Sequence, residues 1–275
     1  MRVTIADIKQ MKVKKEKIVM ITAYDYSMAK LVDESGIPLI LVGDSLGMVM
    51  LGYDSTIPVT MDEMIHHTRA VTRGTKNSLV VGDMPFMTYH TSISEAMKNA
   101  TRFLQQGGCQ SVKLEGGEIA AETVKRIVDC GIPVMGHIGL TPQSINQLGG
   151  YKAQGKTPEA AAQMLRDARA LEQAGAFAIV LETVPAQLGK LITEKISIPT
   201  IGIGAGPECD GQVQVIHDLL GMFSDFVPKH AKQFTKLAPI IKTAFTTYLN
   251  EVKSGVFPAK EHSPAIDESL LKDLK

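Results

Sequence analysis

The 275-residue chain contains no tryptophan, few other aromatic residues and no excess of charge of either sign. Phe, Trp and Tyr together make up 5% of the residues, and 29 Lys and Arg balance 29 Asp and Glu. Nucleic-acid and anionic-membrane binders usually present a basic surface, and base-stacking proteins present aromatic side chains. We therefore expect neither nucleic acid nor a membrane surface as the main partner.

Long apolar runs are missing as well. No run approaches the roughly 20 residues that a bilayer-spanning helix needs, and the N-terminal stretch MRVTIADIKQMKVKKEK lacks the apolar core of a signal peptide. Cys109, Cys130 and Cys209 are widely spaced and form no CxxC pair. They are typical of reduced thiols rather than of a disulfide framework or a zinc site. The sequence thus favours a cytoplasmic protein.

Eight short runs rich in Val, Ile and Leu alternate with helical patterns along the chain. They are almost continuously apolar, as in parallel strands that are covered on both faces. The runs lie at residues 17–25, 37–44, 78–85, 109–117, 132–139, 176–183, 198–206 and 224–230. This alternation predicts an α/β protein, a (β/α)₈ barrel. An open doubly wound sheet is the alternative, but no GxGxxG follows the first strand.

Several helix boundaries can be predicted from local signals. Thr60 with Glu63, and Ser92 with Glu95, have the spacing of a capping box at a helix start. Gly107 is placed to end the helix that Ser92 begins.

The ends of the chain are expected to lie outside the repeating strand–helix pattern. A helix from Thr4 is expected to cover the barrel floor, and a helical stretch follows His230. A tail rich in proline and charge then occupies about residues 255–275. No linker or internal repeat divides the chain, so we expect residues 1–275 to form a single barrel domain with these additions.

Polar side chains stand where the apolar runs end. They are Asp44, Asp83, Lys113, Glu115, His137 and Glu182. A single strand-end carboxylate often only caps a helix or accepts turn amides. In a barrel, however, all strands open their carboxyl ends on one face, so side chains far apart in sequence converge there. Four carboxylates, a lysine and a histidine on one rim favour an active site.

The residue types at this rim indicate metal-assisted chemistry. Asp44, Asp83 and Glu115 are hard oxygen ligands of the kind that suits Mg²⁺, whereas catalytic zinc sites usually enlist histidine. Lys113 lies two residues before Glu115, so both side chains are on one face of a strand and the lysine could hold a substrate carboxylate. Glu182 could act as a general base or could merely anchor a loop. The sequence leaves both roles open.

Several longer motifs resemble the ketopantoate hydroxymethyltransferase family. They are ITAYDYSMAKL, LVGDSLGMV, GDMPF, VKLEGGE, GHIGLTPQS, VLETVP and VPKHAK, and they occur in the family's order from about residue 4 to the EVKSGVFPAKEHS region. The resemblance implies a TIM barrel of the phosphoenolpyruvate/pyruvate-binding type. It also implies transfer of a one-carbon unit from methylenetetrahydrofolate to 3-methyl-2-oxobutanoate, giving ketopantoate for pantothenate and coenzyme A synthesis.

The same resemblance implies roles for individual residues. The implied Mg²⁺ ligands are Asp44, Asp83 and Glu115. The implied substrate contacts are Asp44, Ser45, Asp83 and Lys113. Glu182 is the implied proton acceptor. Members of the family are homo-oligomers, often decamers, so the resemblance implies self-association of this chain too.

Two other functions stay open at this point. The first is a Mg²⁺-dependent C–C lyase or a phosphonopyruvate mutase-like enzyme of the same barrel superfamily. Lyases of that group resemble one another in a KKCGH motif with a catalytic cysteine, and this chain lacks it. The second is a non-catalytic barrel that binds ketoacids. Loss of a metal ligand would favour this second function, and all three acidic residues are present.

Overall fold

The computed structural model describes residues 1–222, 227–267, 269 and 271. Eight parallel strands pair in sequence order, and the last closes against the first, so the predicted (β/α)₈ barrel is confirmed and the open sheet is excluded. The strands are β1 (Ile18–Thr22), β2 (Leu39–Val42), β3 (Leu79–Asp83), β4 (Ser111–Glu115), β5 (Val134–Gly139), β6 (Ala178–Glu182), β7 (Thr200–Ile203) and β8 (Gly211–Gln214).

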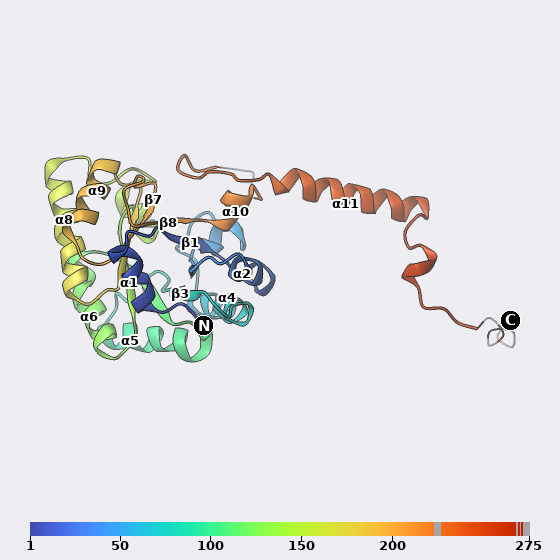
Figure 1. Cartoon of the computed structure of the whole chain (residues 1–275), viewed down its shortest axis with the longest axis horizontal. Helices are drawn as coiled ribbons and strands as arrows, with labels where there is room; N and C mark the ends of the chain where they lie inside the picture. The colour runs from blue at the N-terminus through green and yellow to red at the C-terminus, as the bar shows by residue number, and fades with distance from the viewer. Residues whose placement is uncertain (223–226, 268, 270, 272–275) are drawn as a thin grey trace.

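Helices connect the strands and cover the outside of the barrel (Figure 1). The α-helices, including α1 before the first strand and α10 and α11 after the last, are α1 (Ile5–Val13), α2 (Tyr26–Glu34), α3 (Leu46–Val49), α4 (Met61–Gly74), α5 (Ile93–Arg102), α6 (Ala121–Asp129), α7 (Ile145–Leu148), α8 (Pro158–Gln173), α9 (Ala186–Lys195), α10 (Ile216–Leu220) and α11 (Leu237–Ser254). A π-helical turn, η1 (Phe103–Gly107), extends α5, and short 3₁₀ turns lie at Glu118–Ala120, Pro142–Ser144 and Lys260–His262.

The prediction of the eighth strand was wrong. In the predicted run 224–230, residues 224–226 lie outside the described residues and 227–230 are not a strand. The strand that closes the barrel is β8, whose sequence GQVQ has one apolar side chain and so escapes a search for apolar runs. Gly211 allows the closure, because a Cβ there would lie 2.3 Å from the carbonyl oxygen of Ile18 on β1.

The helix signals are borne out at most positions. Thr60 and Glu63 form a complete capping box at the start of α4, and Ser92 accepts the N–H of Glu95 at the start of α5. The helix that Ser92 begins ends at Gly107 as predicted, and the left-handed residue that caps it is Gly108, with φ of 77°. Gly107 is also needed for close packing, because a Cβ there would lie 2.8 Å from Thr68 Cγ2.

One end of the barrel is closed by the N-terminal helix. Thr4 caps α1 through a reciprocal pair of hydrogen bonds with Asp7. Ile8 of α1 is fully buried in the cluster that fills the barrel interior, together with Ile18 and Met20 of β1. Because α1 occupies the end where the strands begin, the strand carboxyl ends form the open face.

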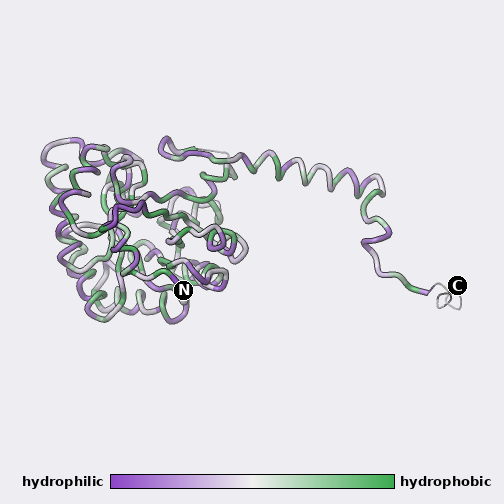
Figure 2. The backbone as a smooth tube through the Cα atoms, in the orientation of Figure 1, coloured by the Kyte–Doolittle hydropathy of each residue, from purple (hydrophilic) through white to green (hydrophobic). Residues whose placement is uncertain are grey.

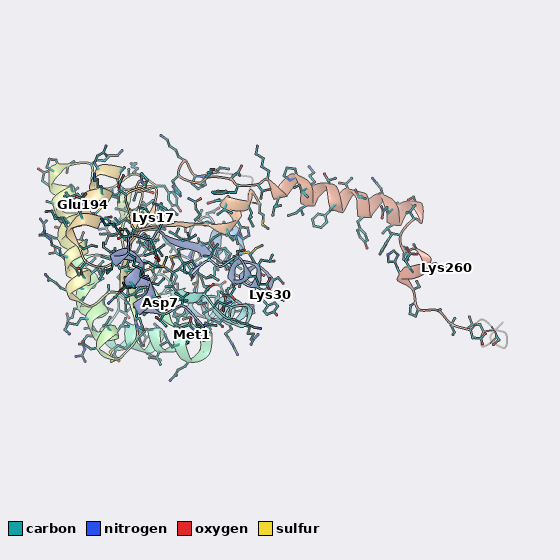
Figure 3. All side chains as sticks on the ribbon, in the orientation of Figure 1. Met1, Asp7, Lys17, Lys30, Glu194 and Lys260 are labelled. Atoms are coloured by element: carbon teal, nitrogen blue, oxygen red, sulfur yellow. The ribbon has the colours of Figure 1, made fainter. Side chains whose placement is uncertain are left out.

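Helix α11 extends away from the barrel. The 3₁₀ turn that contains Lys260 follows beyond the C-terminal end of this helix (Figures 1 and 3). None of the 18 side chains of α11, all of which the structure describes, is buried. Hydrophobic and hydrophilic positions alternate along it (Figure 2). No helix in the described part of the chain is long and apolar enough to cross a membrane.

A buried aspartate connects the segments that lead into the N-terminal ends of β2 and β3. Asp33, near the end of α2, is 5% exposed and accepts the backbone N–H groups of Lys76, Asn77 and Ser78, directly before β3. The Ser78 hydroxyl lies within hydrogen-bond distance of both Asp33 and the Ile37 carbonyl, before β2. Burial opposes ionisation, but the donors outweigh it and lower the pKa of Asp33 to about 2.

We expect Asp33→Asn to lower the free energy of unfolding by about 2 kcal/mol at neutral pH, because the folded pKa lies below the usual value for an unfolded aspartate. A lowered folded pKa stabilises the protein above about pH 4, and this contribution is lost as the pH falls toward 2. Urea denaturation at several pH values measures the difference in free energy of unfolding between Asp33→Asn and the unchanged protein. Asp129→Asn, which removes an exposed carboxylate paired with Lys125, is the control. A loss at pH 3 as large as that at pH 7 would contradict the assignment.

Candidate active site

The register of the barrel brings the strand-end side chains together. Asp83 of β3 is paired in register with Lys113 of β4, and Glu115 of β4 with His137 of β5. Glu182 of β6 is paired with Gly139, two residues beyond His137. Asp44 follows β2 by two residues, and its N–H lies 3.2 Å from Asp83 Oδ2. The structure therefore places all the predicted rim residues at one end of the barrel.

A buried ion pair lies at the centre of this group. Lys113 Nζ is 2.6 Å from Asp83 Oδ1 and 4.0 Å from Glu115 Oε1, and all three side chains are at most 4% exposed. Burial disfavours the ammonium form, but the charges of Asp83, Glu115 and Asp44 outweigh burial and raise the pKa of Lys113. The lysine is therefore a fixed cation among carboxylates.

Asp44 is the carboxylate with the least charge compensation. It is 5% exposed, and burial together with the nearby charge of Asp83 raises its pKa well above the ordinary value. Lys113 and the Gln143 side chain act in the opposite direction without cancelling this effect. Burial thus favours the protonated form of Asp44, and a further cation close to this carboxyl group would favour its ionised form.

His137 links the buried carboxylates to Glu182 at the edge of the site. Its Nδ1 lies 3.3 Å from Glu115 Oε1, and its Nε2 lies 3.4 Å from Glu182 Oε2. Burial and Lys113 lower the pKa of His137, but Glu115 and Glu182 outweigh them and raise it to about 9. His137 is 2% exposed and the Glu182 side chain is 16% exposed, so Glu182 is the more open of the two.

Ser45 reaches the site from the start of α3. Its hydroxyl oxygen is 2.8 Å from that of Tyr24, which is 1% exposed. Burial raises the pKa of Tyr24 above its usual value, so the phenol keeps its proton. Tyr24 therefore holds the Ser45 hydroxyl in place at the end of the barrel.

Three residues in this network were not predicted from the sequence. Tyr24, Tyr89 and Gln143 are each at most 3% exposed and hydrogen-bond to site residues. Tyr24 and Gln143 stand inside the quoted motifs ITAYDYSMAKL and GHIGLTPQS, but each has a polar or charged neighbour and so does not stand out in the sequence. Tyr89 lies in the loop before α5 and carries no comparable signal.

The donor atoms fit a hard divalent cation by their chemistry. Among the described residues, no three His, Cys, Asp or Glu side chains already stand close enough together to hold a metal ion. Nevertheless, Asp44, Asp83 and Glu115 are buried carboxylates, and Glu115 Oε1 has no hydrogen-bond partner among the described residues. Carboxylate oxygens are the ligands that Mg²⁺ prefers, and a dication would offset the excess negative charge.

Comparison with known proteins identifies a close set of relatives. The sequence model of the family described as ketopantoate hydroxymethyltransferase matches residues 2–260. A relative from Dehalococcoides mccartyi is 62% identical over 275 residues, covering 100% of this chain and 98% of the relative. One from Syntrophomonas wolfei is 59% identical over 273 residues, covering 99% of each. Both are named 3-methyl-2-oxobutanoate hydroxymethyltransferase.

More distant solved structures share the fold. Phosphonopyruvate hydrolase superposes with a TM-score of 0.62 at 10% identity, covering 98% of this chain and 94% of that one. 2,3-Dimethylmalate lyase superposes with a TM-score of 0.59 at 15% identity, covering 100% and 99%. At such low identity these structures show the shared barrel fold alone.

We expect Lys113→Met to lower the free energy of unfolding by about 3–5 kcal/mol, because it leaves buried carboxylates without their cation. Chemical denaturation in metal-free buffer measures the loss. Lys125→Met is the control, since Lys125 is 60% exposed in its pair with Asp129 and should cost less than about 1 kcal/mol. The double change Lys113→Met with Asp83→Asn should recover part of the loss. A Lys113→Met protein as stable as the unchanged one would contradict the buried pair.

Proposed function

This chain belongs to the ketopantoate hydroxymethyltransferase family, and from that premise we propose that its acid cluster binds Mg²⁺ and 3-methyl-2-oxobutanoate while methylenetetrahydrofolate supplies the one-carbon unit. The reaction itself follows from the family: the chain is a hydroxymethyltransferase of pantothenate biosynthesis that acts on a small 2-oxo acid. The metal, the folate donor and the residue roles are what we propose.

The single observation that carries this proposal is the convergence of one lysine and three carboxylates in a buried network. Lys113 lies 2.6 Å from Asp83, and the network continues through His137 to Glu182. Asp44, Asp83 and Glu115 would hold Mg²⁺. When bound, the ion would polarise the ketone of the substrate and offset the negative charge that develops on its oxygen.

Lys113 and Ser45 bind the substrate carboxylate in this proposal. The ammonium group of Lys113 supplies a positive charge at the buried end of the site. The Ser45 hydroxyl, held 2.8 Å from the Tyr24 hydroxyl, donates or accepts a hydrogen bond at the same end. Together they orient the ketoacid so that its branched carbon points toward Glu182.

Glu182 accepts the proton from the carbon that bears the two methyl groups. His137 Nε2, 3.4 Å from Glu182 Oε2, is placed to orient that carboxylate. The resulting carbanion forms a bond to the methylene carbon of the folate as the bond from that carbon to one folate nitrogen breaks. Water then replaces the second folate nitrogen: its hydroxyl stays on the carbon, and the nitrogens keep the protons as tetrahydrofolate leaves. The added carbon becomes the hydroxymethyl group of the product.

No enzyme nucleophile is required by this scheme. The three cysteines are free, and burial raises the pKa of the Cys109 thiol to about 12, so it stays protonated. Burial also raises the pKa of the Cys209 thiol. Family membership favours the transferase over the lyase and mutase alternatives, whose solved representatives share only the fold.

We expect Glu182→Gln to slow proton–deuterium exchange at the branched carbon of 3-methyl-2-oxobutanoate by about 10²–10⁴-fold, since it removes the general base. NMR in D₂O measures the exchange, and calorimetry should show ketoacid binding within a few-fold of normal. Glu194→Gln is the matched control, because Glu194 is an exposed glutamate on α9 that is not one of the proposed site residues (Figure 3). Exchange by the unchanged protein should require Mg²⁺ and stop with a chelator.

Two outcomes would count against this scheme. Exchange by Glu182→Gln at the normal rate would assign the base to another group. Exchange by the unchanged protein that survives metal removal would remove Mg²⁺ from the scheme. Ketopantoate formation, unlike exchange, should also require methylenetetrahydrofolate.

We also propose that the chain forms a homo-oligomer through α11, in keeping with the decamer that the family resemblance implies. Phe245, Tyr248, Leu249 and Val252 have the i, i+3, i+4, i+7 spacing of an apolar helix stripe, and they are 45–70% exposed. An apolar stripe of this kind is unfavourable in water and marks a contact surface. A second copy of the chain is the partner that we propose for it.

We expect Phe245→Glu to lower the molecular mass in solution, because it places a charge on the apolar stripe. Light scattering coupled to size exclusion measures the mass. Thr247→Glu is the control: Thr247 is exposed and lies two positions on, on the opposite side of the helix, so the assembly should persist. A monomeric mass for the unchanged chain would contradict the proposal.

A further inference from the structure

Gln143 is the polar residue that ties the acid cluster together. It lies in the 3₁₀ turn Pro142–Ser144, which follows β5, and it is 3% exposed. Its side-chain Nε2 donates to Asp44 Oδ2 at 2.8 Å and to the carbonyl oxygen of Met84 at 3.0 Å. Its backbone N–H donates to Glu115 Oε2 at 3.1 Å. One residue therefore connects the ends of β2, β3 and β4.

Tyr89 completes the hydrogen bonding of this amide. Its hydroxyl donates to Gln143 Oε1 at 2.6 Å and accepts the backbone N–H of Glu115 at 3.1 Å. Tyr89 is 3% exposed, and burial raises its pKa well above the ordinary value, so the hydroxyl keeps the proton that it donates. Both side-chain polar atoms of Gln143 are thus bonded.

The orientation of the amide follows from its neighbours. Rotating it by half a turn would place Oε1 against the Asp44 carboxylate and the Met84 carbonyl, which are both acceptors. It would also leave the Tyr89 hydroxyl facing an amide N–H while that hydroxyl already accepts from Glu115. The hydrogen bonds therefore run in one direction, from the Glu115 N–H through Tyr89 and Gln143 to Asp44.

This direction decides which carboxylate oxygens remain available. Gln143 bonds to Oδ2 of Asp44 and to Oε2 of Glu115. Glu115 Oε1 is buried and has no hydrogen-bond partner among the described residues. His137 Nδ1 and Lys113 Nζ lie 3.3 Å and 4.0 Å from Glu115 Oε1 without a hydrogen bond to it, so this oxygen is the one of the two that a ligand can still meet.

We propose that Gln143 and Tyr89 act as one positioning unit, which fixes the Asp44 and Glu115 carboxylates so that one oxygen of each can bind the cation–ketoacid pair. This role rests on the function proposed above. Neither residue moves the proton or forms the new bond in this scheme. Their effect is on how well the carboxylates are placed before the ligand arrives, and therefore on affinity.

The test uses Gln143→Met, which keeps the side-chain volume, and Tyr89→Phe, which removes one hydroxyl. Each should weaken binding of Mn²⁺, followed by electron paramagnetic resonance as a probe for Mg²⁺, by about 10- to 100-fold. Mg²⁺-dependent binding of 3-methyl-2-oxobutanoate, followed by calorimetry, should weaken alongside. The double variant should lose no more than Gln143→Met alone, because both changes break the same chain of hydrogen bonds.

Gln110→Met is the matched control. Gln110 immediately precedes β4, at the opposite end of the strand from Glu115, and its side chain accepts the Val80 N–H and donates to the Gly108 carbonyl. This change should lower thermal stability and leave Mn²⁺ and ketoacid affinity unchanged.

Each outcome decides the matter. Normal affinity in folded Gln143→Met and Tyr89→Phe proteins overturns the proposal, and so does an equal loss in Gln110→Met, which would indicate general destabilisation. Additive losses in the double variant overturn the single-unit role. If Gln143→Met does not fold, Tyr89→Phe alone decides. Failure of the unchanged protein to bind Mn²⁺ or the ketoacid refutes the proposed function instead.

Discussion

The arrangement of this molecule depends on an excess of buried negative charge at the open end of the barrel. Asp44, Asp83 and Glu115 lie within a few residues of strand ends whose register is fixed by parallel hydrogen bonding, so their carboxylates cannot separate into water. Lys113 balances part of this charge, and so does His137, whose pKa the carboxylates of Glu115 and Glu182 raise to about 9. Uncompensated buried charge is strongly unfavourable, and this is the physical reason for the further cation that we propose at the site.

The rest of the fold keeps these groups in place. Helix α1 closes the end of the barrel where strands begin, which leaves only the carboxyl ends open for a substrate. Asp33 ties the beginnings of β2 and β3 together, and Gln143 ties their far ends to β4. The two ends of the same strands are thus fixed by separate hydrogen-bond networks, one structural and one within the site. A rigid scaffold of this kind allows like charges to stay close without relaxing apart.

Much of this could be predicted from the sequence, and the failures have physical reasons. Buried parallel strands are continuously apolar, so their ends, and the carboxylates that stand there, are visible without a structure. Strand β8 was missed because its sequence GQVQ contains one apolar side chain. Its place in the barrel depends on strand pairing and on the close packing of Gly211 rather than on apolar side chains. Gln143 and Tyr89 were missed because polar residues in turns are ordinary, and only the folded structure shows them buried against carboxylates.

The most direct test of the central claim is a crystal structure of the protein with Mg²⁺ and 3-methyl-2-oxobutanoate. The account predicts one cation at the barrel mouth, with oxygens of Asp44, Asp83 and Glu115 and of the ketoacid around it, at about 2.1 Å where they bind directly. It also predicts the ketoacid carboxylate beside Lys113 and its branched carbon facing Glu182. A cation bound elsewhere, or carboxylates that stay too far apart to share one ion, would contradict it.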